Sequence, residues 1–266
     1  MFSFNTTHTA IMAIINITPD SFYDGNAHFA PEQAVAAALQ AQADGAHIID
    51  LGAHSTRPGS TPVPPAEELR RLLPVLTALQ GKLHIPISVD TFYPEVAEQV
   101  LANGATIIND VSGKITAEMA AVVSQYGAGW VLMHNGGGAD ATPVYTPDVV
   151  TCVRNELAAM VNQAEQLGVT KAQLCIDPGI GFGKTREDNL RLLGNIAKLT
   201  MPGVAMLVGA SRKRVTGEHL PPSERLSATI AAHAIAQLGG ANVLRVHDTK
   251  EAIQAAQWVD NAREIM

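Results

Sequence analysis

The sequence predicts a (β/α)8 barrel, or TIM barrel, in which eight parallel strands alternate with helices. Eight short apolar runs recur along the 266 residues, and a stretch with helix-like boundary signals follows most of them. Alternation of strand and helix is typical of a parallel sheet, and eight repeats in about 250 residues favour its closure into a barrel. Each run also ends in a polar, chemically capable residue, at the end of the strand where the active site of this fold lies.

The expected strands share an apolar composition and a polar residue at or just past the C-terminal end. They are residues 10–16, 47–52, 86–91, 106–112, 129–134, 173–179, 204–211 and 242–248. The polar residues are Asn16, Thr56 with Arg57, Asp90, Asn109, His134, Asp177, Lys213, and Arg245 with His247.

Proline near the start and glycine or asparagine after the end delimit several of the expected helices, as is usual. These helices are residues 32–43, 66–79, 95–102, 117–125, 147–167, 186–199, 222–238 and 250–264. No linker or low-complexity tract divides the chain, so we expect one domain over residues 1–266. Long loops at one rim usually carry binding or gating, and the loops after the first, second, fifth, sixth and seventh strands are longer than closure needs.

Composition narrows the class of partner. Lys and Arg total 18 against 25 Asp and Glu, and the net charge of -7 disfavours nucleic acid and anionic membranes. No apolar run approaches the roughly 18 residues of a membrane span. Cys152 and Cys175 form no CxxC pair and fall in an expected helix and strand, so a reduced, cytoplasmic setting fits.

Residues 179–185 read GIGFGKT and invite comparison with phosphate-binding loops. A P-loop needs four residues between its first glycine and the Gly-Lys-Thr, and here there are three. The dinucleotide pattern also fails, because Lys184 stands where its third glycine belongs. Two interpretations remain open: a backbone that approaches a flat ligand with Phe182 packed on it, or a simple turn between strand and helix.

Asp90 and Asp177 each end an apolar strand, where a carboxylate is costly to desolvate unless it has a partner. That partner is either an arginine or backbone amide, or a heterocycle whose NH groups a carboxylate accepts in pairs. Asn109 offers both a donor and an acceptor to the same ring. Three such groups on three strands favour an amide-like or pteridine-like ligand over a sugar.

A second group of residues is basic. Arg245 and His247 are two apart on a strand and therefore share a face, and Lys213 follows the preceding strand. Phosphate often binds near the seventh and eighth strands of such barrels, which favours a phosphate or diphosphate site here, opposite Asn16. A structural salt bridge is the alternative. The role of His134, near the same rim, stays open.

Seven sequence blocks, in order over nearly the whole chain, resemble the dihydropteroate synthase family. They are IINITPDSF (14–22), GAHSTRPG (52–59), ISVDT (87–91), IINDVSG (107–113), DPGIGFGKT (177–185), SRK (211–213) and LRVHD (244–248). Seven blocks together are far more specific than any one. The resemblance implies condensation of dihydropterin-methyl diphosphate with p-aminobenzoate, with Mg2+ as cofactor and a homodimer as the expected assembly.

The resemblance also implies roles for individual residues. Asp90, Asn109, Asp177 and Lys213 would bind the pterin, with Met133 and Phe182 packed around it. Asn16, Arg245 and His247 would bind the diphosphate, and Asn16 would also ligate the metal. The remaining implied residues belong to two loops that close over the site: Phe22, Asp24, Ser55, Thr56 and Arg57.

The chain departs from the usual family pattern in three places, and all lie in loops or near the second substrate. Ala53 and His54 replace Gly and Glu before STRPG, and Asn135 begins an unusual fifth loop. Arg214 stands where a serine near the aminobenzoate carboxylate is usual; we expect its long side chain to extend into solvent. Two alternatives therefore stay beside the leading hypothesis: a catalytically impaired pterin-binding paralogue, and a pterin-binding methyltransferase.

Overall fold

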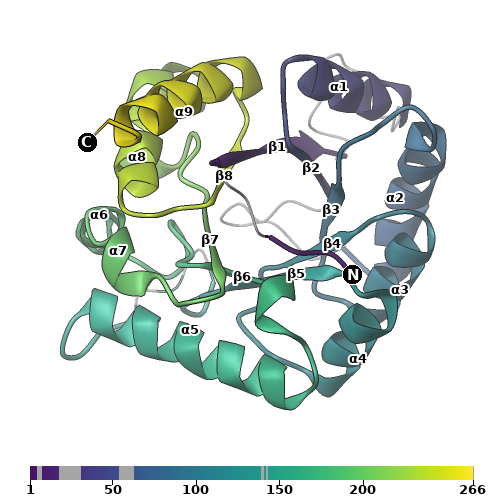
Figure 1. The fold of residues 1–266 in the computed structure, drawn as a ribbon, viewed down its shortest axis with the longest axis horizontal. Helices are drawn as coiled ribbons and strands as arrows, with labels where there is room; N and C mark the ends of the chain where they lie inside the picture. Colours follow the sequence, from purple (N-terminus) through teal and green to yellow (C-terminus); the bar gives the residue numbers. More distant parts are fainter. Residues whose placement is uncertain (5–7, 18–30, 54–62, 139–140, 142, 266) are drawn as a thin grey trace.

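The computed structural model describes residues 1–4, 8–17, 31–53, 63–138, 141 and 143–265, and these form a closed barrel. Eight parallel strands follow one another in chain order, and β1 pairs with β8 to complete the ring (Figure 1). Helices surround the strands on the outside. The predicted (β/α)8 fold is confirmed.

Seven of the eight strands are shorter than the apolar runs that predicted them, and β1 matches its run. Their bounds are β1 Ala10–Asn16, β2 Ile48–Gly52, β3 Ile87–Asp90, β4 Ile107–Asp110, β5 Gly129–Met133, β6 Leu174–Asp177, β7 Ala205–Val208 and β8 Val243–Val246. The helices are α1 Pro31–Ala43, α2 Pro65–Leu79, α3 Pro94–Ala102, α4 Ala117–Tyr126, α5 Val149–Gln166, α6 Arg186–Leu193, α7 Ile196–Leu199, α8 Leu226–Leu238 and α9 Thr249–Arg263.

Two predicted helices differ in the structure. The stretch 186–199 is broken into α6 and α7, because Asn195 leaves the helical conformation and its side chain donates to the Arg191 carbonyl at 2.8 Å. The stretch 222–238 begins with a separate 3-10 turn, Pro222–Glu224, and the α-helix starts only at Leu226. At the first of these places the local hydrogen bond of Asn195 competes with continuation of the helix.

The barrel interior holds its own apolar core, separate from the larger core between strands and helices. Its members are Phe4, Ala10, Met12, Ile48, Ile107, Val131, Cys175, Leu207 and Val243. Successive side chains of a strand point to opposite faces, so the residues two and four positions further along each strand also point into the barrel.

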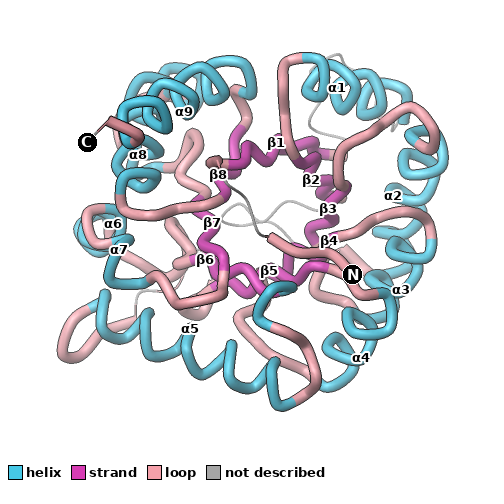
Figure 2. Tube along the Cα trace, viewed as in Figure 1, coloured by secondary structure: helices cyan, strands magenta, loops and turns pink. Residues whose placement is uncertain are grey.

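The N-terminal segment lies across the N-terminal ends of the central strands, beside β4 and β5 in Figure 2. The Phe2 amide donates to the Gly127 carbonyl at 2.7 Å, and the Phe4 amide to the Ala172 carbonyl at 3.0 Å. The two phenyl rings meet edge to face, with centroids 4.9 Å apart. This end of the barrel is therefore occupied by aromatic side chains.

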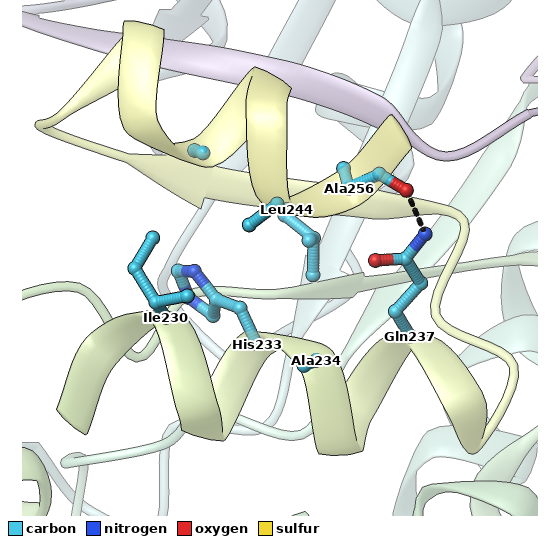
Figure 3. Close-up of a pocket in the computed structure, with 8 residues that line it drawn as sticks. Ile230, His233, Ala234, Gln237, Leu244 and Ala256 are labelled. Atoms are coloured by element: carbon cyan, nitrogen blue, oxygen red, sulfur yellow. Dashed lines mark hydrogen bonds between the residues drawn. The ribbon is translucent and has the colours of Figure 1, made fainter. Parts of the chain in front are cut away.

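A small cavity of about 10 Å³ lies between α8 and α9, outside the barrel (Figure 3). Its lining is mostly apolar, and at one side the Gln237 side chain donates to the Ala256 carbonyl at 2.9 Å. A space of this size holds about one water molecule, so it is a packing defect and not a substrate site. None of the described helices combines the length and apolar composition that crossing a lipid bilayer requires.

Candidate active site

The alternation of side chains along the strands brings the predicted site residues to the inner face at the C-terminal rim. Each lies two or four residues beyond a member of the interior core, in the same strand or just past its end. The residues placed this way are Asn16, Asn109, Met133, Asp177, Arg245 and His247. Pairing aligns Gly52 with both Asn16 and Asp90, and Asp90 with Asn109, so these strand ends form one level of the barrel.

Arg245 lies between two carboxylates. Its Nε donates to Asp50 at 2.7 Å and its terminal nitrogen to Asp90 at 3.0 Å, while only 19% of the Arg245 side chain is exposed. The salt bridge considered as an alternative is thus present. It does not displace the anion-site hypothesis, because a guanidinium has five N–H donors and these two bonds occupy two of them.

Asp50, in the middle of β2, is a site residue that the sequence interpretation missed. It is fully buried, and its carboxylate accepts hydrogen bonds from Ser88 Oγ at 2.6 Å, Asn109 Nδ2 at 3.1 Å and Arg245. Asp50 therefore fixes Asn109 and Arg245 relative to each other. A signal was available: Asp50 is the charged residue of an otherwise apolar strand, two positions after the inward-facing Ile48.

Asp177, at the end of β6, and Lys213, after β7, lie on another side of the barrel rim. Asp177 accepts a hydrogen bond from the Gly179 amide at 2.7 Å, and burial raises the pKa of this carboxyl group, partly offset by Lys213. Lys213 Nζ donates to the Ile180 carbonyl at 2.6 Å and lies 4.8 Å from the centroid of the Phe182 ring. Burial lowers the pKa of Lys213 to about 8.

The segment after β7 is held in an unusual conformation. Arg212 has a φ of 56°, which a non-glycine residue rarely adopts, and its guanidinium forms an ion pair with Asp248. Ser211 Oγ lies 2.9 Å from His247 Nδ1 and accepts from the His247 amide at 3.1 Å. These contacts join the ends of β7 and β8, from which Lys213 and His247 emerge.

Arg214 begins a 3-10 turn, Arg214–Thr216, and is exposed. This agrees with the expectation that its side chain extends into solvent. The predicted site residues Thr56 and Arg57 lie outside the described residues, as do Phe22, Asp24, Ser55 and the variant position His54.

The side chains at the rim can be compared with the ligands that the expected Mg2+ ion requires. Among the residues that the structure describes, no group of three or more His, Cys, Asp and Glu side chains could hold a metal ion. Asn16 is half-buried at the end of β1 and supplies one amide oxygen, a ligand type that hard cations accept. The residues present therefore fit an ion that takes most of its ligands from substrate phosphate and water.

The rim of this parallel barrel brings together paired carboxylates, an amide and three basic side chains. This arrangement is typical of a barrel enzyme that binds a polar heterocycle with an anionic group. The model of the family described as pterin binding enzyme matches residues 12–247. The chain belongs to this family and, within it, to the dihydropteroate synthases, as its relatives show.

The chain is 41% identical to the dihydropteroate synthase of Synechocystis sp., over 95% of this chain and 89% of the relative. It is also 41% identical to that of Mycobacterium leprae, over 94% and 92%. Among solved structures, Xanthomonas albilineans dihydropteroate synthase with 4-aminobenzoic acid superposes with a TM-score of 0.91 at 42% identity, over 97% of this chain and 94% of that one. The Burkholderia cenocepacia enzyme complexed with 7,8-dihydropteroate gives 0.88 at 35% identity, over 98% and 94%.

Proposed function

We propose that this rim joins dihydropterin-methyl diphosphate to p-aminobenzoate and releases dihydropteroate and diphosphate through the residues assigned below. The observation that carries the proposal is a hydrogen-bond network of inward-facing side chains at the rim. In it Arg245 donates to Asp50 and Asp90, and Asn109 donates to Asp50. Groups for a pterin and a cation for its leaving group are therefore held in one network.

The pterin half of the site consists of Asp90, Asn109, Asp177 and Lys213. Asp177 accepts hydrogen bonds from ring NH groups, and Asn109 both donates and accepts. Burial of Asp177 makes each such bond stronger than it would be in water. Phe182, with its ring beside Lys213, and the buried Met133 supply the apolar contacts to the ring faces.

The diphosphate half consists of Asn16, Arg245 and His247. As the bond to diphosphate breaks, negative charge grows on the leaving group and positive charge on the pterin methylene. Arg245 stabilises the first charge with its remaining N–H groups, and Asp90 offsets the second. The hydrogen bonds that Arg245 donates to Asp50 and Asp90 hold the guanidinium in place before the substrate arrives, so little reorganisation is needed during the reaction.

Mg2+ would complete this half, and Asn16 would be its protein ligand. When bound, the ion would neutralise part of the diphosphate charge and so improve the leaving group. An amide oxygen as protein ligand suits an ion that takes its other ligands from the substrate phosphates and from water, and so enters together with the substrate.

Thr56 and Arg57, which lie outside the described residues, are assigned a catalytic role in this proposal. Their expected effect is to exclude water, which competes with the weakly nucleophilic amine of p-aminobenzoate for the methylene carbon. The reaction requires no strong general base, because the aniline nitrogen loses its proton after the carbon–nitrogen bond has formed.

The assembly and the compartment are further parts of the proposal. A homodimer is supported by exposed apolar side chains on α8 and α9, namely Ile235, Leu238 and Trp258. A cytoplasmic location is supported by the free thiols of Cys152 and Cys175, which fit a reducing setting. Sedimentation of the wild-type chain and of Trp258→Ser tests the first.

Diphosphate release, measured with and without p-aminobenzoate in the presence of Mg2+, tests the function. We expect release that depends on p-aminobenzoate and forms dihydropteroate in equal amount. The surface variant Lys250→Met should match the wild type. A folded chain that binds pterin but releases no diphosphate would be the impaired paralogue, whereas methyl transfer from a methylated pterin without diphosphate release would identify the methyltransferase.

A further inference from the structure

Lys184, in the loop between β6 and α6, has no part in the function described above, yet its amino group is surrounded by acceptors. Its Nζ donates to the carbonyls of Phe182 at 2.8 Å, Gly179 at 3.0 Å and His134 at 3.3 Å, and lies 2.9 Å from His134 Nδ1. The first two carbonyls belong to the loop after β6, and His134 directly follows β5. Lys184 thus joins two neighbouring loops at the rim.

The partners define the protonation of this cluster. An ammonium group has three protons and no lone pair, so His134 Nδ1 accepts and the imidazole proton lies on Nε2. That nitrogen is 3.0 Å from Glu156 Oε2, although not aligned as a hydrogen bond. Burial lowers the pKa of His134 to about 4, so its ring is neutral at pH 7 and can accept from Lys184.

Burial also lowers the pKa of Lys184 to about 7. Nearby carboxylates oppose this shift, and the Lys213 ammonium adds to it. The charged groups that face Lys184 are Asp177 on β6, Glu156 on α5, Asp188 on α6 and Lys213 after β7. The group therefore retains protonated population at neutral pH, in the form that can serve three acceptors at once.

Backbone packing and Tyr145 join the same two loops. The Tyr145 hydroxyl donates to the Gly183 carbonyl at 2.7 Å. A Cβ atom on Gly183 would lie 2.1 Å from the Gly136 carbonyl oxygen, and one on Gly179 would lie 1.9 Å from that of His134. Both glycines have positive φ, so other residues would be strained as well as blocked.

These contacts fix two consecutive carbonyl groups, those of Phe182 and Gly183. The Phe182 ring, on the same short segment, lies beside Lys213. We propose that Lys184, assisted by Tyr145, is a positioning residue that holds Phe182 as a wall of the pterin pocket. The inference rests on the proposed role of Phe182 and extends it to the unusual fifth loop, which supplies Tyr145.

Calorimetry with two ligands tests the proposal in the whole 266-residue chain. A pterin without diphosphate reports on the pocket wall, and inorganic diphosphate with Mg2+ reports on the Arg245 side. For Lys184→Met we expect pterin binding to weaken about tenfold, and for Tyr145→Phe about threefold, since each removes donors to the loop. Diphosphate binding should change less than about twofold, and the surface variant Lys171→Met should change neither.

Unchanged pterin affinity in both folded variants, or equal losses for the two ligands, would overturn the proposal. If Lys184→Met does not fold, Tyr145→Phe decides, because it removes one hydroxyl and leaves no buried charge unpaired. Phe182→Ala separates this inference from the proposed function. Full pterin affinity in Phe182→Ala would contradict the pocket wall itself, whereas a loss there without a loss in the other two variants would contradict only the role of Lys184 and Tyr145.

Discussion

The two ends of the barrel use the same strands for different purposes. Toward the N-terminal end the interior is filled by apolar side chains, including Met12, Ile48 and Val243, and the Phe4 ring packs against them. Two residues further along β2 and β8 stand Asp50 and Arg245, which are ion-paired across the rim. Two residues of a strand span roughly 6.6 Å, so the change from apolar core to charged network takes place within one layer of side chains.

This contrast shows how a barrel keeps stability and chemistry apart without separate domains. Because side chains alternate between the two faces of a strand, residues two apart keep both layers on the inner face. The apolar layer lies toward the N-terminal ends of the strands and the charged layer toward their C-terminal ends. Burial stabilises the first layer, whereas the second is costly to bury and persists because its charges are paired. Substitutions in the two layers should therefore affect different measurements.

Removing the central cation of the charged layer should have the largest effect. Arg245→Ala removes the cation that pairs with Asp50 and Asp90, so we expect a loss of unfolding free energy of up to about 3–5 kcal/mol, reduced by the partial exposure of Arg245. Turnover should fall about a hundredfold or more, because the leaving group loses its stabilising charge.

Steady-state kinetics and binding of a pterin without diphosphate check the assignment of Arg245. The pterin should bind the variant with little loss, since Arg245 is assigned to the leaving group. Equal losses of affinity for this pterin and for the pterin substrate that carries diphosphate would show that Arg245 does not belong to the diphosphate site. Arg245→Lys is the matched control, because it keeps the charge but not the paired N–H geometry.

A change in the apolar layer should give the opposite pattern. Phe4→Ala removes a ring that is 4% exposed, and we expect the unfolding free energy to fall by about 3 kcal/mol, measured by urea denaturation. The kcat of the folded variant, measured well below its melting temperature, should remain that of the wild type. A large loss of kcat in fully folded protein would show that the two layers are not independent.

Asp177→Asn tests one acceptor of the charged layer. Pterin affinity should fall by about 2–4 kcal/mol, because ring NH groups lose an anionic partner in a buried site. Stability should not fall, because burial raises the pKa of Asp177, which means that the fold disfavours its charged form. Calorimetry that finds unchanged pterin affinity in the folded variant would refute the pocket assignment.

The pH dependence of stability involves two buried histidines, His134 at the rim and His233 on α8 beside the cavity of Figure 3. Burial lowers the pKa of each to about 4 in the folded chain, against an ordinary value of 6.5. Between pH 6.5 and 4 the unfolded chain therefore binds more protons than the folded chain. The contribution of these histidines to the unfolding free energy is present above pH 6.5 and is lost as the pH falls through this range.

Each histidine should give a slope of up to about 1.4 kcal/mol per pH unit in that window. His233→Gln keeps an acceptor for the Ala210 amide, which His233 Nε2 binds at 3.1 Å, and cannot be protonated. Urea denaturation from pH 4 to 7 should show a shallower slope for this variant. An unchanged slope would mean that His233 does not titrate on unfolding.

Most of the fold was predictable from the sequence, because strand periodicity, helix boundaries and repeat number all indicate the same barrel. The strand-end residues were predictable for the same reason, since position along the strand fixes the rim and alternation fixes the face. Asp50 was missed because only strand ends were considered, although the same alternation places it inward.

The links between loops could not be predicted. Lys184 was noted only as the residue that breaks a dinucleotide motif, and Tyr145 was not considered. Their contacts depend on how closely Gly136 and Gly183 pack, which no local pattern encodes. The break after α6 was missed for a related reason: the bond from Asn195 to the Arg191 carbonyl is a local competitor of the helix.

Arg214 should give the smallest effect, although it departs from the usual family pattern near the second substrate. The expected small hydroxyl at this position leaves room for the aminobenzoate carboxylate, and arginine offers a charge-assisted bond in its place, worth roughly 1.5–3 kcal/mol if it were buried. The structure places Arg214, which is itself exposed, at the start of a 3-10 turn after Lys213, and a long side chain costs little to leave in solvent. Arg214→Ser should therefore change the KM for p-aminobenzoate by less than about threefold, under roughly 0.7 kcal/mol. A rise of about tenfold or more, without a change in the KM for the pterin substrate, would instead make Arg214 a carboxylate ligand and extend the charged layer of the rim into the loop after β7.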